Sequence, residues 1–397
     1  MATYKEQNKL NVPHLRFPEF HGEWEEHGLS EYLDFKNGLN PDSKRFGKGI
    51  KFISVMDILN NPVITYDCIR ASVQATDAEM SSFSVENGDI LFQRSSETLE
   101  DVGRANVYID DKVAVFGGFV IRGKKKANYN PLFFRYLLSS PYARKRIIPM
   151  GAGAQHFNIG QEGLSKVLLN FPSIEEQTKI APLLHLLDER IATQSKLIEK
   201  LESLIKGIVD CTILRKEKNA IVGDVCSISE QIRAEANIDD IITVRLHGNG
   251  VCKSSAENLQ LGATQYYRRR AGQLIYGKQN FHNGAIGIVP ISLDNGITSK
   301  DIPSFDIDEM KCNSVYLLAQ LQSPQYYKPA EALTTGTGSK RLKEETFLKL
   351  PIVLPNKREQ DNIAVLIHRA SMNLDHAKRL LELLSIQKQF LLRQMFI

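Results

Sequence analysis

Two short stretches decide how the chain is organised: Glu175-Glu-Gln-Thr-Lys-Ile-Ala181 and Arg358-Glu-Gln-Asp-Asn-Ile-Ala364. They share the pattern Glu-Gln-x-x-Ile-Ala and lie 183 positions apart in a chain of 397 residues. The same offset relates Pro172 to Pro355. Because self-similarity at a fixed period is the mark of a duplicated unit, the sequence predicts two copies of one fold.

Matches further upstream extend each copy over nearly half of the chain. Ser140-Pro141 matches Ser323-Pro324, and, as loop lengths shift the offset, Gly88-Asp-Ile-Leu-Phe92 matches Gly272-Gln-Leu-Ile-Tyr276 and Ile53-Ser-Val55 resembles Ile242-Thr-Val244. Each copy therefore reads as a variable block followed by a long helix. We predict a first block at 1–172, a first helix at 173–214, a second block at 215–355 and a second helix at 356–397.

Both helices are predicted to begin with the same capping residues. Ser173 and Asn356 are good N-caps, and each is followed three positions later by a glutamate, Glu176 or Glu359, as in a capping box. Pro182 lies about two turns into the first helix and predicts a kink or a local break there.

Downstream of each cap, apolar residues recur at alternating spacings of four and three, which is a heptad seam. The seam positions are Ile180, Leu184, Leu187, Ile191, Ile198 and Leu201 in the first copy, and Ile363, Ile367, Leu374, Leu381 and Leu384 in the second. Lys388 stands where the first copy has Ile205. The shared register predicts that two helices of about 50 Å face each other, rather than each packing only on its own block.

The two blocks read as mixed α/β. Strands are expected at 50–55, 89–93, 113–121, 241–246, 273–277 and 285–289, between turns rich in Gly, Asn and Asp. One helix per block is expected before the Ser-Pro pair, at 132–138 and 314–321. The predicted fold class is therefore α/β (α+β), with two mixed domains separated by two long helices that pair as an antiparallel coiled coil, in a pseudo-twofold internal repeat.

Composition narrows the class of protein. The chain is 42% hydrophobic and 24% charged, and it has no apolar run near the roughly 20 residues that span a bilayer. The N-terminal residues lack the apolar core of a secretory signal, so a cytoplasmic location is expected. The five cysteines form no CxxC pair and are expected to be free thiols.

The net charge of +4 is too small to indicate a nucleic-acid binder by itself, but basic and amide side chains gather on the expected loops of both blocks. Such side chains contact phosphates and base edges. A single cluster of this kind is more often a solvated face than a DNA contact, but these clusters recur at matching places in the two copies. The candidate DNA contacts are Lys44, Arg45, Gln93, Arg94, Arg104, Lys124, Lys125, Gln155, His156 and Asn158, and in the second block Tyr267, Arg268, Arg269, Lys278, Gln279, Asn280, Lys340 and Arg341.

Motifs for catalysis are weak. Asn130-Pro-Leu-Phe133 is reminiscent of the Asn-Pro-Pro-Tyr motif of adenine methyltransferases, but it lacks the second proline and precedes an expected helix. The glycine pairs lack the strand-to-helix context of a nucleotide loop, and no catalytic or metal-ligand constellation stands out. The sequence therefore predicts a module that provides specificity for other subunits.

This organisation resembles the specificity subunit of type I restriction-modification enzymes. The resemblance rests on the alternation of variable blocks and helices, on the helix starts Glu176–Ala181 and Glu359–Ala364, on the strand beginning at Gly88, and on the opening Val12-Pro-His-Leu-Arg-Phe-Pro-Glu-Phe20 with Trp24. It covers essentially the whole chain.

The resemblance implies a non-catalytic DNA-recognition subunit of an antiviral defence system. Each block would be a target recognition domain that reads one half of a bipartite, asymmetric DNA site, and the paired helices would set the spacer. Two modification subunits, which bind S-adenosylmethionine and methylate DNA, would dock on the helical regions; restriction subunits would add ATP- and Mg-dependent translocation and cleavage. The alternatives are a coiled-coil scaffold for two protein-binding domains and a DNA-binding regulator.

Overall fold

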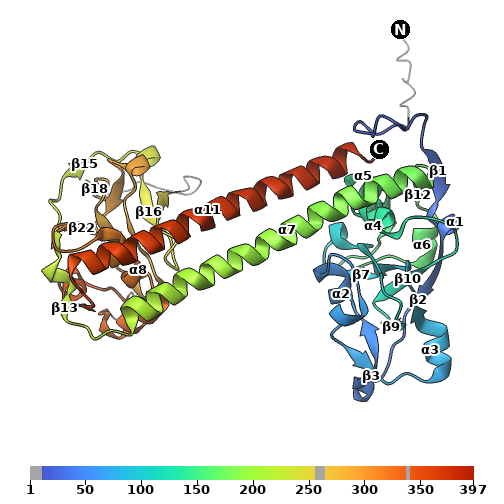
Figure 1. The fold of residues 1–397 in the computed structure, drawn as a ribbon, viewed down its shortest axis with the longest axis horizontal. Helices are drawn as coiled ribbons and strands as arrows, with labels where there is room; N and C mark the ends of the chain where they lie inside the picture. The colour runs from blue at the N-terminus through green and yellow to red at the C-terminus, as the bar shows by residue number, and fades with distance from the viewer. Residues whose placement is uncertain (1–10, 255–263, 337–339) are drawn as a thin grey trace, which may run out of the picture. The chain divides into compact units, whose positions relative to one another are not determined.

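A computed structural model describes residues 11–254, 264–336 and 340–397 (Figure 1). Its contacts divide the chain into two compact units: unit 1 comprises residues 1–195 and 380–397, and unit 2 comprises residues 196–379. Each of the two long helices therefore contributes one half to each unit.

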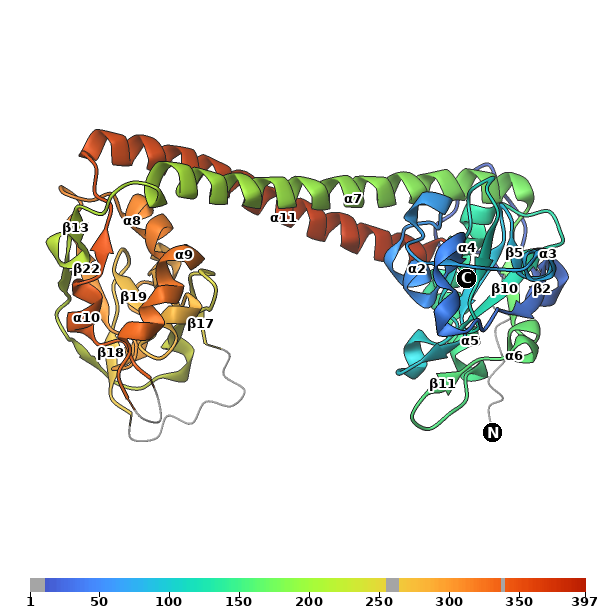
Figure 2. The ribbon, with the colours of Figure 1, turned by 90° about the horizontal axis from the view of Figure 1, so that it is seen from below.

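Unit 1, which is drawn in Figures 1 and 2, contains two four-stranded sheets and two short strand pairs. One sheet has the order β2 (Leu33–Asn37), β10 (Val120–Lys125), β6 (Ile90–Gln93), β8 (Ala105–Val107), and the other has the order β4 (Ser72–Val73), β3 (Phe46–Ile53), β9 (Ala114–Phe116), β5 (Ser84–Val85). The pairs are β1 (Glu25–Gly28) with β12 (Leu168–Phe171), and β7 (Ser95–Ser96) with β11 (Phe157–Asn158). The helices of the block are α1 (Leu29–Tyr32), α2 (Val55–Asn60), α3 (Asp77–Phe83), α4 (Pro131–Ser139), α5 (Pro141–Ile147) and α6 (Gln161–Ser165).

Unit 2 repeats part of this design. Its four-stranded sheet has the order β14 (Cys226–Ile228), β22 (Ser304–Ile307), β19 (Leu274–Tyr276), β20 (Ile286–Ile288). A three-stranded sheet contains β15 (Arg233–Ala234), β18 (Tyr266–Arg268) and β21 (Ile297–Ser299), and the pairs are β16 (Ile242–Val244) with β17 (Val251–Lys253) and β13 (Ala220–Ile221) with β23 (Pro351–Ile352). The short helices are α8 (Ser314–Leu321), α9 (Pro324–Tyr327) and α10 (Glu344–Leu348).

The predicted strands and helices are found in both units, with one correction. The expected strand at 113–121 is two strands, β9 and β10, joined by a turn at Gly117 and Gly118. An added Cβ on Gly118 would clash with the Asn40 side chain, and one on Gly117 would lie 2.6 Å from the Phe52 ring. The two glycines therefore turn the chain where the run of apolar residues alone predicts a continuous strand.

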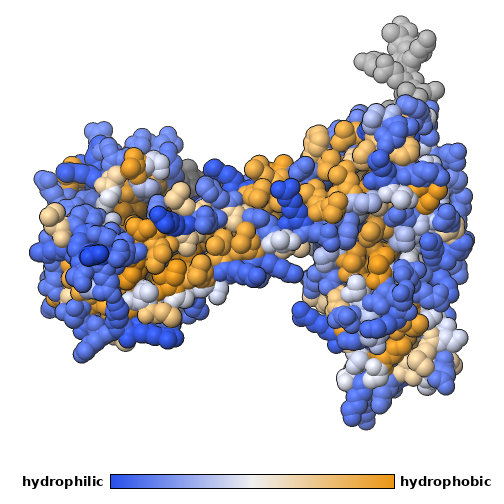
Figure 3. Space-filling model, in the orientation of Figure 1, coloured by the Kyte–Doolittle hydropathy of each residue, from blue (hydrophilic) through white to orange (hydrophobic). Residues whose placement is uncertain are grey.

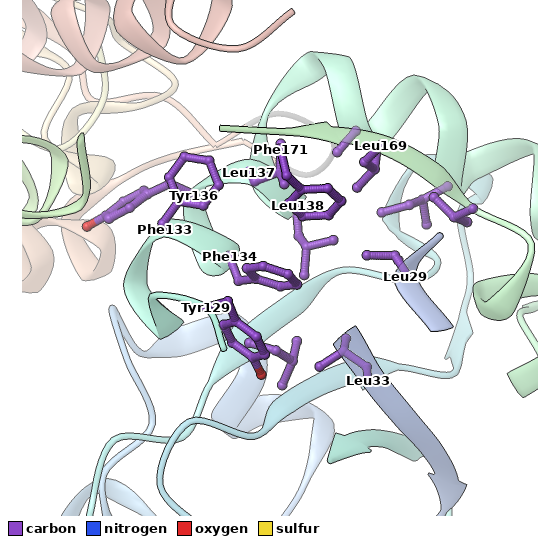
Figure 4. Close-up of a cluster of buried hydrophobic side chains, with 14 of the residues drawn as sticks. Leu29, Leu33, Tyr129, Phe133, Phe134, Tyr136, Leu137, Leu138, Leu169 and Phe171 are labelled. Atoms are coloured by element: carbon purple, nitrogen blue, oxygen red, sulfur yellow. The ribbon is translucent and has the colours of Figure 1, made fainter. Parts of the chain in front are cut away.

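The core of unit 1 is aromatic and lies where the block meets the long helices (Figure 4). Tyr129 stacks on Phe134 with ring centroids 3.9 Å apart, and Phe134 stacks on Phe171 at 5.2 Å. Ile180 and Leu184 of the first long helix belong to the same buried cluster, as does Phe396 near the C-terminus. Burial of this apolar surface is what holds the block on its helices.

The first long helix, α7, spans Ile174–Val209 and continues as a π-helical turn at Asp210–Leu214; the second, α11, spans Lys357–Gln394. The predicted caps are present, since Ser173 Oγ accepts from the Glu176 amide at 3.4 Å and Asn356 Oδ1 accepts from the Glu359 amide at 3.0 Å. The two glutamates form ion pairs, with Arg16 and Lys216 respectively. The predicted break at Pro182 is wrong: α7 continues through Pro182, which is exposed.

The glutamine of each repeated stretch connects a block to its helix. Gln177 Oε1 accepts from the Asn130 amide at 3.0 Å, and its Nε2 donates to the Pro172 carbonyl at 3.1 Å. Gln360 makes the same two bonds, with the Asn313 amide at 2.9 Å and the Pro355 carbonyl at 2.8 Å. Asn130 and Asn313 are the N-caps of α4 and α8. The repeated Glu-Gln-x-x-Ile-Ala sequence therefore fixes the same junction twice.

The halves of α7 and α11 that share a unit lie side by side and run antiparallel (Figures 1 and 2). In unit 1, Lys388 of α11 pairs with Asp188 of α7 at 2.5 Å, and in unit 2, Lys378 pairs with Glu202 at 2.8 Å. The predicted seam residues are all buried or half-buried. Those nearest the blocks, such as Ile363 and Ile367 in unit 2, also pack into the block's core, so the helices pair with each other and pack on the blocks as well.

Candidate nucleic-acid interface

Several of the predicted DNA contacts of unit 1 come together at the end of β6. The Gln93 amide donates to the Arg104 carbonyl at 2.7 Å, and the Arg94 carbonyl accepts from the Ile159 amide at 2.9 Å. The second of these bonds holds the hairpin at 152–158 beside β6, and a bridge between Ala152 and Asn158 closes that hairpin. Gln155, His156 and Asn158 are exposed on it.

Side-chain contacts link Ser95, Asn158 and His156 at this place. Ser95 Oγ hydrogen-bonds to Asn158 Oδ1, and Asn158 Nδ2 donates to the His156 carbonyl at 3.3 Å. Arg94 Nη1 donates to the Gly118 carbonyl at 3.3 Å. We call the group Arg94, Ser95, Arg104, Gln155, His156 and Asn158 the unit 1 loop cluster. Ser95 is not a candidate from the sequence, because a serine between two short polar runs carries no distinguishing signal.

Gln93 differs from its neighbours because it is buried. Its Nε2 donates to the Ser95 carbonyl at 2.9 Å, so the side chain shapes the strand end on which Arg94 lies. Its Oε1 has no hydrogen-bond partner within the described part of the chain. Gln93 thus stabilises the backbone on which the loop cluster lies, and its side chain is not exposed in that cluster.

The remaining candidates of unit 1 lie elsewhere on the block. Lys124 and Lys125 are at the opposite end of β10 from Phe119 and Arg94; Lys124 pairs with Glu86 at 3.3 Å, and Lys125 Nζ lies over the Tyr129 ring at 4.8 Å. Lys44 and Arg45 form a 3₁₀ turn before β3. Arg45 is ion-paired with Glu79, and its guanidinium holds the pKa of Glu79 down to about 2. Lys44 is exposed.

Unit 2 has a corresponding group of residues, held by a matching set of backbone hydrogen bonds. The Lys278 carbonyl accepts from the Leu342 amide at 2.9 Å, as Arg94 does from Ile159, and a bridge between Thr335 and Arg341 matches the bridge between Ala152 and Asn158. Gln279 and Asn280 follow Lys278 and are exposed. We call the group Lys278, Gln279, Asn280, Lys340 and Arg341 the unit 2 loop cluster.

Ion pairs moderate the positive charge of the unit 2 loop cluster. Lys278 Nζ lies 2.7 Å from Glu344, Arg341 lies 3.2 Å from Asp301 and Lys340 lies 3.4 Å from Glu331. Burial raises the pKa of Glu344, but the hydrogen bond and the charge of Lys278 outweigh it and keep that pKa below its usual value. An exposed pair such as that of Arg341 is weak in water, so its guanidinium can exchange the carboxylate for a phosphate or a base edge.

Arg269 has a structural role that its sequence does not reveal. It is fully buried, and it donates to Thr298 Oγ1 at 2.7 Å, to Ser304 Oγ at 2.9 Å and to the Ile302 carbonyl at 2.9 Å. Burial lowers its pKa to about 10. Because its donors are used inside the fold, Arg269 is removed from the candidate DNA contacts. Its neighbours Tyr267 and Arg268 lie on β18, in a different sheet from β19 and the unit 2 loop cluster.

Residues 11–254, 264–336 and 340–397 contain no sign of a metal or a membrane-spanning site. Within these ranges no group of three His, Cys, Asp or Glu side chains is placed to hold a metal ion. No helix there is both long and apolar enough to cross a membrane. The five cysteines are unpaired, as predicted.

The outward faces of the long helices carry a second row of apolar residues besides the seam, and Figure 3 shows apolar surface along both helices. We call it the outer stripe. Its exposed members are Leu183, Leu186, Leu197 and Leu204 on α7, and Val365, Leu366, Met372, Leu380, Leu383, Ile386 and Phe390 on α11. Apolar residues that remain exposed in a row mark an interaction surface.

Comparison with known proteins finds one family that the chain resembles. Residues 21–203 match the model of the type I restriction modification DNA specificity domain. Two curated relatives come from Methanocaldococcus jannaschii. The putative type I restriction enzyme MjaX specificity subunit is 25% identical over 53% of this chain and 49% of its own length, so the match spans about half of that relative. The type I restriction enzyme MjaVIII specificity subunit is 19% identical over 92% of this chain and 89% of its own length.

A solved structure agrees in fold. The S subunit of the type I restriction-modification system of M. genitalium superposes with a TM-score of 0.64 over 97% of this chain and 99% of that one, at 13% sequence identity. The duplicated block, the matched sheet order, the repeated junction at Gln177 and Gln360 and these matches agree with one another. The sequence of residues 21–203 and the fold of nearly the whole chain thus match those of type I restriction-modification specificity subunits.

Proposed function

We propose that each unit reads one half of a bipartite, asymmetric DNA site through its loop cluster. The observation that carries this proposal is that one backbone arrangement is built twice with different side chains on it. Arg94 and Asn158 in unit 1 correspond to Lys278 and Arg341 in unit 2, on matching hydrogen bonds. Guanidinium, amide and ammonium groups differ in the bases they recognise, so two such clusters specify two different half-sites.

The long helices provide the frame for the two readers. Their length sets the distance between two half-sites along a duplex, where one turn takes about 10 base pairs. The glutamine junctions hold each block on the helices at a fixed angle, which a constant spacer requires. Under this proposal the chain provides the sequence specificity of the complex and catalyses no reaction.

The outer stripe is the docking surface for partner subunits under this proposal. Two modification subunits, which bind S-adenosylmethionine and methylate DNA, would each bind one half of the paired helices. Restriction subunits that use ATP and Mg would then join that complex. All of them act on DNA in the cytoplasm. The row of exposed Leu, Ile, Met and Phe side chains supports a protein partner, because apolar anchors of this kind dominate protein interfaces.

The test is methylome sequencing of cells that carry the modification subunits with and without this chain. The expected result is one split motif, two unlike half-sites around a constant spacer, which is methylated only when the chain is present. Methylation of a single contiguous motif, or methylation that does not depend on the chain, would contradict the proposal. A scaffold that binds only proteins would leave the set of methylated sequences unchanged.

A further inference from the structure

An apolar hollow of about 470 Å³ lies in unit 1 next to the loop cluster. Three of its side chains are conspicuously exposed: Phe119 by 69%, Met56 by 61% and Phe46 by 42%. Figure 3 shows apolar surface at the end of unit 1 where β3 and β9 lie. Single exposed apolar residues are ordinary, but aromatic rings that converge on one hollow are not, and they indicate a binding surface.

The fold holds Phe119 outward. The glycine turn between β9 and β10 is packed against Asn40 and the Phe52 ring, which leaves no room for side chains at Gly117 and Gly118. Beneath the turn, Val115 and Phe116 are fully buried, whereas Phe119 is 69% exposed. The closely packed turn therefore presents the Phe119 side chain to solvent.

The same turn is bonded to Arg94, the central residue of the unit 1 loop cluster. The Arg94 amide donates to the Phe119 carbonyl at 2.9 Å, and the Arg94 guanidinium donates to the Gly118 carbonyl at 3.3 Å. Ser95 of the cluster also lines the hollow. A ligand that contacts Arg94 is thus brought against the exposed face of Phe119.

The lining of the hollow suits DNA. Its polar members are Asn40, Ser54 and Ser95, and none of the described lining residues carries a carboxylate that would repel a phosphate backbone. Lys44 and Lys48, which flank Phe46 in sequence, are exposed. In the major groove, the base feature that an aromatic ring recognises is the 5-methyl group of thymine.

We propose that Phe119, with Met56 and Phe46, forms an apolar contact that recognises the 5-methyl group of a thymine in the first half-site, beside the base read by Arg94. This inference rests on the proposed function and adds a specificity-determining residue to it. Phe119 would contact a thymine in the first half-site only, and it would not affect recognition of the second half-site.

The test replaces thymine by deoxyuridine, which removes only the methyl group. Duplexes that contain the methylated motif carry one such replacement at a time, and the complex of this chain with its modification subunits is titrated against them in a competition assay. Loss of one buried methyl group should weaken binding about fourfold at one thymine of the first half-site. The Phe119→Ala complex should bind the thymine duplex about fourfold more weakly and no longer distinguish thymine from deoxyuridine there.

Met310→Ala is the matched control for Met56→Ala, because Met310 is 88% exposed in unit 2. It should keep the full discrimination, and Met56→Ala should reduce it. The proposal is overturned if the first half-site holds no thymine that shows the effect, if Phe119→Ala keeps the discrimination, or if Phe119→Ala instead loses its modification subunits. In each of these cases the preference for the split motif can persist, so the proposed function would stand.

Discussion

At the scale of single residues, the two glutamines explain why one short sequence occurs twice. Gln177 and Gln360 each accept from the amide of an N-cap asparagine and donate to the carbonyl of the proline that precedes the long helix. Both glutamines are buried. A buried amide that satisfies two backbone groups costs little, whereas its loss leaves both groups unpaired.

Replacement of Gln177 by Leu should therefore lower the free energy of unfolding by about 2 kcal/mol. Hydrogen exchange should show the effect first at the start of α4, because the Asn130 amide loses its acceptor. Gln387→Leu, on the exposed face of α11, is the matched control and should change stability by less than about 0.5 kcal/mol. Equal effects of the two substitutions would show that the junction does not depend on Gln177.

Asp188 is a second residue whose role depends on its neighbours. It is buried, and Lys388 at 2.5 Å, Arg135 at 3.0 Å and the Tyr136 hydroxyl at 3.0 Å surround its carboxylate. Burial raises its pKa, but the hydrogen bond and charge of Lys388, followed by the charge of Arg135 and the hydroxyl of Tyr136, bring it below its usual value. The lysine that interrupts the apolar seam thus has a partner.

Because the native pKa of Asp188 is depressed, its contribution to stability is present above about pH 4 and is lost as the pH falls through the native pKa. Asp188→Asn should be about 3 kcal/mol less stable than the natural chain at pH 7, and this gap should shrink toward pH 3. Urea denaturation at a series of pH values measures it. Asp375→Asn, on the exposed face of α11, should show no such gap. A gap for Asp188→Asn that does not change with pH would be inconsistent with this ion pair.

At the scale of elements, each long helix has two apolar rows that differ in exposure to solvent. The seam is buried or half-buried against the other helix and the blocks, and the outer stripe is exposed. Leu383 and Leu384 show the contrast, since these neighbours in sequence are 57% and 5% exposed. Adjacent leucines therefore belong to different interactions.

Leu383→Lys should leave the helix content and the unfolding temperature of the chain nearly unchanged, because the side chain is exposed. It should weaken binding of a modification subunit by about 1 to 3 kcal/mol, as expected when an interface anchor is lost. Leu384→Lys should instead destabilise the fold itself, since it buries a charge. Circular dichroism and a titration with the purified modification subunit separate the two effects. Normal assembly by a folded Leu383→Lys chain would exclude Leu383 from the docking surface.

The periodicity of apolar residues predicts the helices and strands well, but it does not predict the turn between β9 and β10 or the continuation of α7 through Pro182. The seams, the caps and the helices α4 and α8 follow from spacings of three and four residues, and β6 and β19 follow from short apolar runs. The turn at Gly117 and Gly118 was missed because apolar residues continue on both sides of it. The break predicted at Pro182 does not occur, because one missing amide bond and the ring of an exposed proline do not outweigh the packing of the flanking turns.

The candidate site could be predicted only in part, because a charged residue in a sequence does not reveal its partner. Arg269 looks like Arg268 in the sequence, yet three buried acceptors hold it inside unit 2. Arg94 and Asn158 are 64 positions apart and meet through the pairing of β7 with β11, a long-range contact that no local pattern encodes. Phe119 was missed because an exposed phenylalanine reads as a core residue.

At the scale of the whole molecule, the repeat gives two similar blocks on two shared helices, and the proposed function assigns one DNA half-site to each block. Insertion of seven residues after Ser195 and seven after Arg379 preserves the apolar seam in both helices. It adds about 10 Å of helix, which corresponds to about three base pairs. Methylome sequencing should then show both half-sites unchanged with a spacer longer by about three base pairs. An unchanged spacer would refute the idea that the helices measure distance.

The proposed function requires that the two blocks read DNA independently. The most direct measurement is methylome sequencing of a chain in which residues 20–172 are exchanged for the corresponding block of another specificity subunit. We predict a new first half-site together with the original second half-site, because the unit 2 loop cluster is untouched. Loss or change of specificity at both half-sites would contradict the claim.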